Sequence, residues 1–294
     1  MFYGEIAALS AAVVWAVATW IYSQFSHQFT AMQLNIVKGV IASVMMLLVM
    51  PLIPTPEYTL TPQHLAILAV SGVIGIAIGD SAYFSALKRI GPNKTLLLES
   101  LAPPLSGVLA LVFLGTAISV QAWLGVVVTT VAVASVVFQP SSSSEPTSYT
   151  GIGYGLLASV CQASGVVISH YALVAGNLPP LLGALVRLSV GVAAVVLIIA
   201  WFEDKPFKQI RLNLLSMGNR AFLWLFSAIF VGTFLALWLQ QVALKHANPA
   251  IAQTLIATSP IFILIIYAVR REAISRQSVV GTLFAVAGIS LFFL

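Results

Sequence analysis

Four ionisable side chains stand inside long apolar runs of this 294-residue sequence: Lys38, Asp80, Glu99 and Arg187. A charged group in the hydrocarbon of a membrane costs several kcal/mol unless it is paired or hydrated. Side chains of this type in such surroundings can pair with one another, move a proton, or bind a charged solute. Each of the four is therefore a candidate functional residue.

Three of these residues are expected at one depth in the first half of the chain. Counted at about 1.5 Å per helical residue, Lys38, Asp80 and Glu99 lie roughly 9, 11 and 8 Å from the same membrane face, in three different helices. One interpretation is a structural ion network in which Asp80 is the partner of Lys38. The other is a proton-coupling group, in which one of two carboxylates beside a single lysine loads and releases a proton. Glu99 is the stronger candidate for that role, because it precedes Pro103, where the helix is weakened.

Arg187 stands apart from that group. It is expected roughly 10 Å below the opposite face by the same helical rise. The apolar runs of the second half contain no acidic residue, since Glu203, Asp204 and Glu272 all map near the first face. A guanidinium without an acidic partner needs carbonyl groups, water or an anionic ligand. Arg187 could hold a substrate carboxylate or phosphate, or it could cap backbone carbonyls or face an aqueous vestibule.

Aromatic, hydroxyl and amide side chains on four of the expected helices are candidates for the lining of a substrate cavity. Trp and Tyr could sandwich an apolar or aromatic substrate while amides orient it. Ordinary helix packing, or a belt at the membrane surface, is the alternative for each of them. The candidates are Trp15, Thr19, Tyr83, Trp238, Gln241, Gln253 and Thr254.

The composition defines the elements that must position these side chains. The chain is 60% hydrophobic and 7% charged, whereas soluble proteins have about 25% charged residues. The apolar residues form runs of about 20, enough to cross a bilayer as helices. The alternation typical of a transmembrane barrel is absent. The sequence therefore predicts an all-α polytopic membrane protein with ten transmembrane helices, near residues 4–22, 32–50, 65–87, 93–113, 121–138, 152–174, 180–201, 221–244, 249–268 and 277–294.

The two halves of the chain repeat one template. Ala86-Leu87-Lys88 recurs 157 residues later as Ala243-Leu244-Lys245, and Pro103 recurs as Pro260. A register of 149 residues maps Lys38 onto Arg187. We expect a five-helix repeat over 1–138, a Ser- and Pro-rich linker over 139–150 and a second repeat over 151–294. Because five is odd, the second repeat must be inverted in the membrane, with a site at the interface of the repeats near the midplane. Pro103 and Pro260 are candidate paired hinges, and static kinks are the alternative.

The basic residues indicate an orientation. One expected face carries most of them, and we call it the basic face; the other carries only Lys245. The positive-inside rule makes the basic face cytoplasmic and both termini extracytoplasmic. Basic residues at helix ends indicate membrane anchoring and not nucleic-acid binding, although the formal net charge is +5. The residues of the basic face are Lys88, Arg89, Lys94, Lys205, Lys208, Arg211, Arg220, Arg270, Arg271 and Arg276.

These patterns resemble the drug/metabolite transporter superfamily in its ten-helix, EamA-type form. The resemblance rests on the two Ala-Leu-Lys turns, on Pro103 and Pro260, on Gly4 and Trp15 in the first helix, and on the basic residue in the second helix of each half. It implies a secondary transporter that exports small metabolites, in a bacterial inner membrane. The anchor for an anionic group that Arg187 offers favours a substrate with a carboxylate, such as an amino acid. Two features depart from the family pattern. Thr116 stands where a Gly-Glu turn often ends the fourth helix, and many relatives have cytoplasmic termini.

Other function classes find less support in the sequence. No Walker A motif is present, which excludes ATP hydrolysis within this chain. A membrane-embedded enzyme would need a catalytic constellation such as His-Glu-x-x-His or Gly-x-Ser-x-Gly, and none is found. A purely structural or regulatory protein does not explain the ionisable residues within the spans. A channel is harder to exclude, but the broken inverted repeat favours a carrier. We expect no cofactor and no metal site, and as partners a small-molecule substrate, the lipid bilayer and protons as the coupling ion. Nucleic acid is not expected, and the chain could be a monomer or a homodimer.

Overall fold

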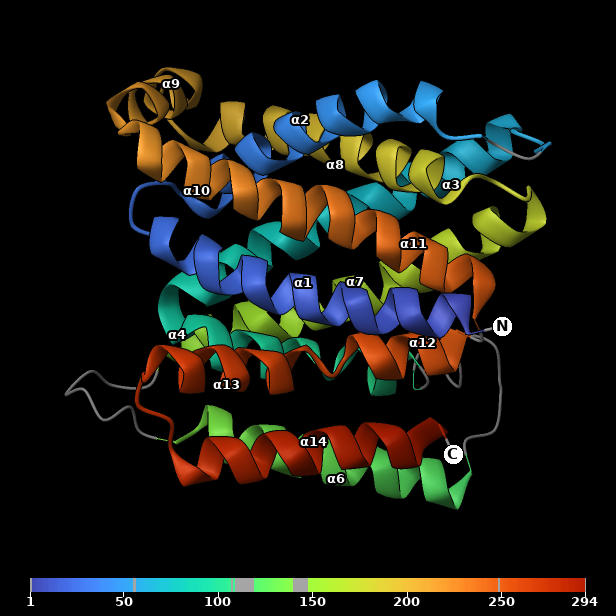
Figure 1. Cartoon of the computed structure of the whole chain (residues 1–294), viewed down its shortest axis with the longest axis vertical. Helices are drawn as coiled ribbons and strands as arrows, with labels where there is room; N and C mark the ends of the chain where they lie inside the picture. Colours follow the sequence, from blue (N-terminus) through green and yellow to red (C-terminus); the bar gives the residue numbers. More distant parts are fainter. Residues whose placement is uncertain are drawn as a thin grey trace.

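The computed structural model describes residues 2–54, 57–106, 108, 119–139, 148–247 and 249–293. Every regular element in these residues is a helix, and the helices run mostly along one common direction in stacked layers (Figure 1). Within this part of the chain, eight helices are long and apolar enough to cross a membrane. The prediction of an all-α polytopic membrane protein is confirmed. The number of ten crossings stays a prediction, because the fourth crossing continues into residues that lie outside the described ranges.

In the described residues of the first half, the main elements are helices and a short 3-10 turn. They are α1 (Tyr3–Phe25), α2 (Ala31–Val49), the 3-10 turn η1 (Met50–Leu52), α3 (Pro62–Gly72), the π-helix η2 (Val73–Asp80), α4 (Ser81–Glu99) and α6 (Val120–Val137).

The second half repeats much of this order. Its elements are α7 (Tyr149–Ala175), α8 (Pro180–Phe202), α9 (Pro206–Ser216), α10 (Asn219–Ile229), the π-helix η3 (Phe230–Leu235), α11 (Ala236–His246), α12 (Pro249–Ile256), α13 (Ser259–Arg270) and α14 (Arg276–Phe293). The sequence did not predict α9, which lies in the charged stretch between two spans. The described parts of most predicted spans agree with the observed helices to within a few residues.

The chain turns back at Gly91, in the middle of α4. Gly91 has φ 74° and ψ 172°, a conformation that favours glycine, and Pro92 follows it. The two sides of this break carry Asp80 and Glu99. In an uninterrupted helix these residues would stand about 28 Å apart, yet both line one cavity. The break between the third and fourth predicted spans is therefore a reversal of the chain.

Each half carries a π-helical segment in its third long helix. The segment η2 starts at Val73 and η3 starts at Phe230, so the two follow the 157-residue register of the sequence repeat. A π turn has i→i+5 hydrogen bonds and shifts the phase of every side chain that follows it. Hydropathy does not reveal such a shift, because the helix stays apolar on both sides of the segment.

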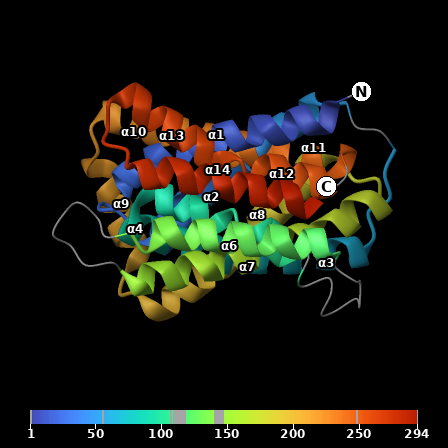
Figure 2. The same ribbon diagram turned by 90° about the horizontal axis from the view of Figure 1, so that it is seen from below.

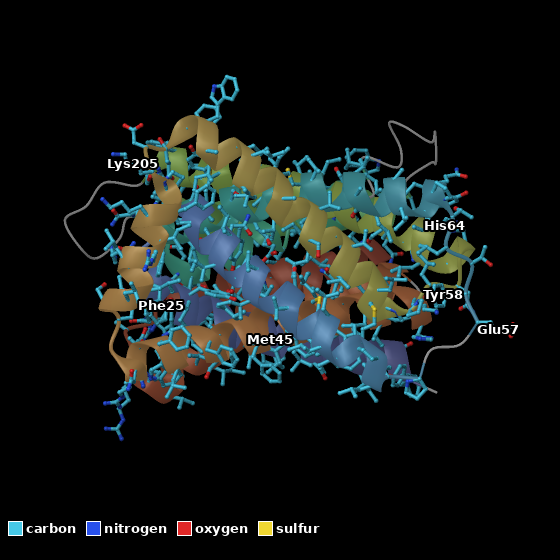
Figure 3. The ribbon with its side chains drawn as sticks, turned by 90° about the horizontal axis from the view of Figure 1, so that it is seen from above. Phe25, Met45, Glu57, Tyr58, His64 and Lys205 are labelled. Carbon is cyan, nitrogen blue, oxygen red and sulfur yellow. The ribbon has the colours of Figure 1, made fainter. Side chains whose placement is uncertain are left out.

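The major contacts join the first half of the chain to the second. Helix α1 packs against α11, η3, α12 and α13, whereas α7 packs against α3, η2 and α4. Helix α2 lies beside α8 on the face seen in Figure 3. Helix α6 lies beside α14 as a separate layer in Figure 1, and the two helices lie in front of the others when seen from below in Figure 2. Helix α1 begins and α14 ends at the same end of the bundle (Figure 1).

Candidate functional site

A small cavity of about 80 Å³ lies between the two halves of the chain. This volume is enough for several water molecules or for part of a small solute. Helices from both halves contribute its wall: α1, α2, η2 and α4 from the first, and α7, η3, α11, α12 and α13 from the second. The polar and aromatic side chains of the lining are Trp15, Lys38, Asp80, Glu99, Ser100, Gln162, Gln240, Gln253 and Ser259.

Lys38 and Asp80 form an ion pair at one side of this cavity. Lys38 on α2 is 1% exposed and bonds the carboxylate of Asp80, the last residue of η2. Asn35, one turn before Lys38, donates from Nδ2 to the Ile76 carbonyl at 2.8 Å and to Ser81 Oγ at 3.0 Å. These bonds fix the end of the π-helix against α2, so the pair sits in a well-defined place.

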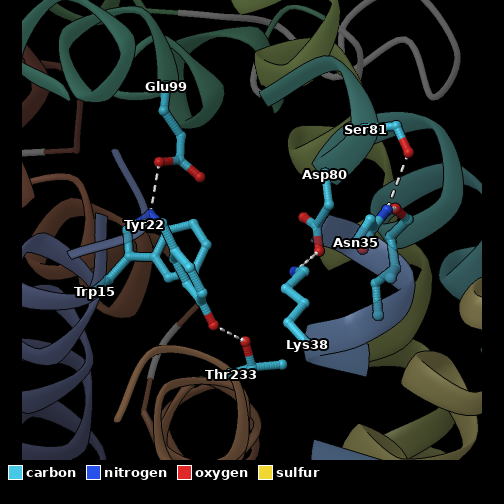
Figure 4. Close-up of polar contacts among 9 residues, drawn as sticks. Trp15, Tyr22, Asn35, Lys38, Asp80, Ser81, Glu99 and Thr233 are labelled. Carbon is cyan, nitrogen blue, oxygen red and sulfur yellow. Dashed lines mark hydrogen bonds and ion pairs between the residues drawn. The ribbon is translucent and has the colours of Figure 1, made fainter. Parts of the chain in front are cut away.

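Glu99 lies across the cavity from that pair and is held by the indole of Trp15 (Figure 4). Trp15 Nε1 donates to Glu99 Oε2 at 2.8 Å. The Trp15 ring packs on Tyr83 with 5.2 Å between ring centroids, and the Tyr83 hydroxyl bonds Thr19 Oγ1 at 2.6 Å. Thr19 and Tyr83 therefore support the wall from behind and do not line the cavity themselves.

Three glutamines complete the polar lining, and only Gln253 was among the sequence candidates. Gln253 Oε1 accepts from Ser106 Oγ at 3.3 Å.

Gln240 Oε1 is buried without a hydrogen-bond partner among the described residues. The candidate Gln241 is fully buried next to it and does not line the cavity. In the structure Gln240 shares a helix face with Ala236, four residues before it, and both line the cavity; the sequence alone did not favour Gln240 over Gln241. The sequence analysis did not identify Gln162 on α7, because a single amide among small and apolar residues gives no distinctive pattern.

The other two lining candidates lie elsewhere. Trp238 packs edge-on against Phe234, with 5.9 Å between ring centroids. Thr254 is partly buried on α12, beside Gln253. Neither residue lines the cavity of this structure, and a substrate contact for either stays a prediction.

Arg187 is buried on α8, outside the lining of the cavity. Its side chain is 2% exposed, and its Nε and Nη1 atoms have no hydrogen-bond partner among the described residues. It fits beside glycine backbone: a Cβ added to Gly75 would lie 3.2 Å from Arg187 Nη2 and 3.8 Å from the Gly165 Cα. Gly75 lies in the π-helix η2, which ends at Asp80. The substrate role of Arg187 stays a prediction.

The two repeat-related prolines line the cavity at helix breaks. Pro103 follows a turn at residues 100–101, and Pro260 is the second residue of α13, after the turn at residues 257–258. In the first turn of a helix an amide N–H has no partner within the helix, so proline costs little there. At both positions a turn interrupts the helix before the proline, so the proline stands in the first turn of a new helix instead of kinking a continuous one. The hinge role of both residues stays a prediction.

This arrangement can bind a cation or a proton. The cavity brings two carboxylates, one lysine, an unpaired amide oxygen and an indole ring together. Lys38 is already paired with Asp80. Glu99 therefore has no cationic partner among the described residues and is bonded by the indole of Trp15. Among the described residues, no three His, Cys, Asp or Glu side chains are grouped as metal ligands would be.

Comparison with known proteins shows the family and the fold of this chain. A curated relative from Archaeoglobus fulgidus, described as an uncharacterized transporter, is 26% identical over 287 residues, which are 97% of this chain and 96% of the relative. A solved crystal structure of a protein 14% identical in sequence superposes with a TM-score of 0.69 over 98% of this chain and 95% of that one, which shows the shared fold. The model of the EamA-like transporter family matches residues 2–138 and again residues 149–294. The chain is a multi-pass membrane transporter and belongs to the EamA-like transporter family.

Proposed function

We propose that this chain is a secondary active transporter that exports small metabolites with a primary ammonium group, amino acids among them. We further propose that it works by alternating access between two inverted repeats, residues 1–138 and 151–294, joined by the linker 139–150. The observation that carries this proposal is the cavity between the halves, where Glu99 is held by Trp15 opposite the Lys38–Asp80 pair. The direction of transport and the amino-acid substrates rest on the resemblance and on this chemistry.

The free acceptors of the cavity favour an ammonium group. Glu99 uses Oε2 for the bond from Trp15, and its Oε1 has no bond to a described residue. Gln240 Oε1 is likewise without a partner among those residues. Bonds between an ammonium and a carboxylate are charge-assisted and about twice as strong as neutral ones. The face of the Trp15 indole would add a cation–π contact.

Coupling to protons follows from competition at Glu99. The carboxylate can hold the substrate ammonium or a proton, but not both at once. A proton that binds at Glu99 on one side of the membrane would release the substrate, and loss of the proton on the other side would allow the next substrate to bind. The expected cycle is an exchange of substrate for protons, in which Trp15 keeps its bond to Oε2.

The first test replaces Glu99 by Gln in purified protein reconstituted into vesicles. We expect Glu99→Gln to bind a substrate amino acid about 10- to 100-fold more weakly, as the loss of a charge-assisted hydrogen bond implies. We also expect it to lose uptake driven by a pH gradient. Glu57→Gln, on an exposed loop residue, is the matched control. Proton-driven accumulation that survives in Glu99→Gln would assign Glu99 to a structural role.

The second test concerns Arg187 as the anchor for a substrate carboxylate. This role requires that Arg187 reach the substrate in another state of the transport cycle, because it lies outside the present cavity lining. Arg187→Gln is then expected to weaken transport of an amino acid about tenfold or more and to leave its decarboxylated amine unaffected. Arg211→Gln on the exposed helix α9 is the control. Equal losses for both substrates would show that Arg187 holds the fold and not the carboxylate.

A further inference from the structure

A second, larger cavity of about 690 Å³ lies at the basic face and shares no lining residue with the central cavity. We call it the basic-face groove. One of its walls is formed by α2 and α8, which lie side by side in Figure 3, where Lys205 marks the basic end. Its other wall is formed by η2, α4 and α7. The transport cycle proposed above does not use this groove.

The part of the groove that runs toward the membrane interior is apolar. Ile78 of η2 is 42% exposed and Leu157 of α7 is 44% exposed, and both line the groove with Ile198 of α8. Exposed apolar side chains on membrane-spanning helices contact the acyl chains of lipids, so this part of the groove offers a channel for one such chain.

The wall of α4 and α7 carries two cations at the mouth of the groove. The Arg89 guanidinium stacks 4.9 Å from the centroid of the Tyr154 ring, and its Nη1 donates to the Ser85 carbonyl at 2.9 Å. These contacts hold the guanidinium in place while its other N–H groups stay free to bind a phosphate. Lys88 also lines the groove, and its ammonium has no hydrogen bond or ion pair with a described residue.

The wall of α2 and α8 carries a carboxylate at the same end. Glu203, which follows α8, accepts from Thr30 Oγ1 and from Gln33 Nε2, each at 2.8 Å. An ionised carboxylate has about four acceptor positions, so Glu203 can accept further bonds. The groove therefore presents two cations on one wall and one fixed anion on the other, above an apolar channel.

We propose that the basic-face groove binds one phospholipid with a primary-amine headgroup, of the phosphatidylethanolamine type. The lipid phosphate bonds Arg89 and Lys88, the headgroup ammonium bonds Glu203, and one acyl chain lies along Ile78 and Leu157. A headgroup that carries both charges matches the two walls. A lipid with only a negative charge leaves Glu203 unmatched, and a quaternary ammonium offers Glu203 no N–H donor.

The test is native mass spectrometry of the full chain, purified in detergent with equal amounts of phosphatidylethanolamine, phosphatidylcholine and phosphatidylglycerol. We expect one tightly retained phosphatidylethanolamine in the wild-type protein. Glu203→Gln should remove the preference for the amine lipid, while Arg89→Gln should weaken retention of all three lipids about tenfold, since each loses a charge-assisted bond. Equal retention of the three lipids by the wild-type protein would overturn the proposal, and so would a preference for phosphatidylglycerol.

Two kinds of control keep this result specific. Asp204→Asn and Lys208→Gln remove an exposed acid and an exposed base at the same end of the molecule, outside the groove, and should behave as the wild type. Leu157→Trp fills the apolar channel from an exposed position and should release the lipid without disturbing either charged wall. A bound phosphatidylethanolamine that survives in Leu157→Trp as in the wild type would place the lipid elsewhere and overturn the proposal. These readouts measure lipid and not transport, so they succeed or fail independently of the proposed function.

Discussion

Lys38 and Asp80 show how one buried pair serves both structure and chemistry. The pair ties α2 to the end of η2 and forms part of the cavity wall. A buried ion pair adds little net stability, because its attraction offsets the loss of hydration of both groups. Removal of one partner is much more damaging, since it leaves the other charge buried and alone.

This reasoning predicts the behaviour of Asp80→Asn. We expect the substitution to lower the free energy of unfolding by about 3–5 kcal/mol, because it leaves the Lys38 ammonium without its carboxylate. A second substitution, Lys38→Met, should restore most of that loss by removing the unpaired charge. Thermal denaturation of the purified proteins in detergent would measure both changes. If the double variant is no more stable than Asp80→Asn, the damage arises from lost cavity structure and not from the charge.

At the scale of elements, glycines allow helices of the two halves to approach closely. Gly72, the last residue of α3, packs directly on the backbone of Arg187 in α8. Such an approach is possible only without a Cβ, and it fixes the position of α8 beside the π-helix that carries Asp80. The contact thereby links the backbone that holds Arg187 to the backbone that holds the ion pair.

Gly72→Ala is therefore expected to destabilise the protein by about 1–3 kcal/mol, the usual range for an overpacked contact. The new methyl group would meet the Arg187 backbone, where carbonyl oxygen and Cα cannot rotate away as a side chain can. Gly153→Ala on α7 is the matched control, because a Cβ there has nothing within 4 Å. The control should be neutral or slightly stabilising. Equal melting temperatures for the two variants would show that α3 and α8 can separate without cost.

At the scale of the whole molecule, the first and last helices place both ends of the described chain at the same end of the bundle. Helix α1 begins at this end of the bundle, and helix α14 ends there (Figure 1). The basic helix α9, with Lys205, Lys208 and Arg211 in or beside it, lies at the other end. By the positive-inside rule we expect that basic end in the cytoplasm and both termini outside.

Labelling with an impermeant thiol reagent tests this arrangement in intact cells. In a Cys161→Ser background, cysteines added at either terminus should react from outside. A cysteine at Lys208→Cys, on the exposed surface of α9, should react only after the cells are opened. Termini that react from opposite sides would contradict an even number of crossings. If both termini are protected in intact cells, the fold stands but its orientation in the membrane is the opposite of the one expected here.

The amino-acid sequence by itself determined the class of the molecule and the chemistry available to it. Apolar runs of about 20 residues favour helices in a bilayer. Gly91-Pro92 separates the third and fourth predicted spans in the sequence, whereas the backbone angles of Gly91 and the reversal there came from the structure. The ionisable residues Lys38, Asp80, Glu99 and Arg187 were identifiable because so few charges occur inside apolar runs.

The tertiary structure alone decided which of these groups meet. It paired Glu99 with Trp15, turned Gln240 and not Gln241 toward the cavity, and placed Arg187 behind glycine backbone outside the lining. The physical reason is rotational phase. One residue turns a helix by about 100°, and the π segments η2 and η3 shift the phase again without any change in hydropathy. Contacts between residues far apart in the chain depend on that phase, so they follow from the packing of the helices and not from the pattern of any one of them.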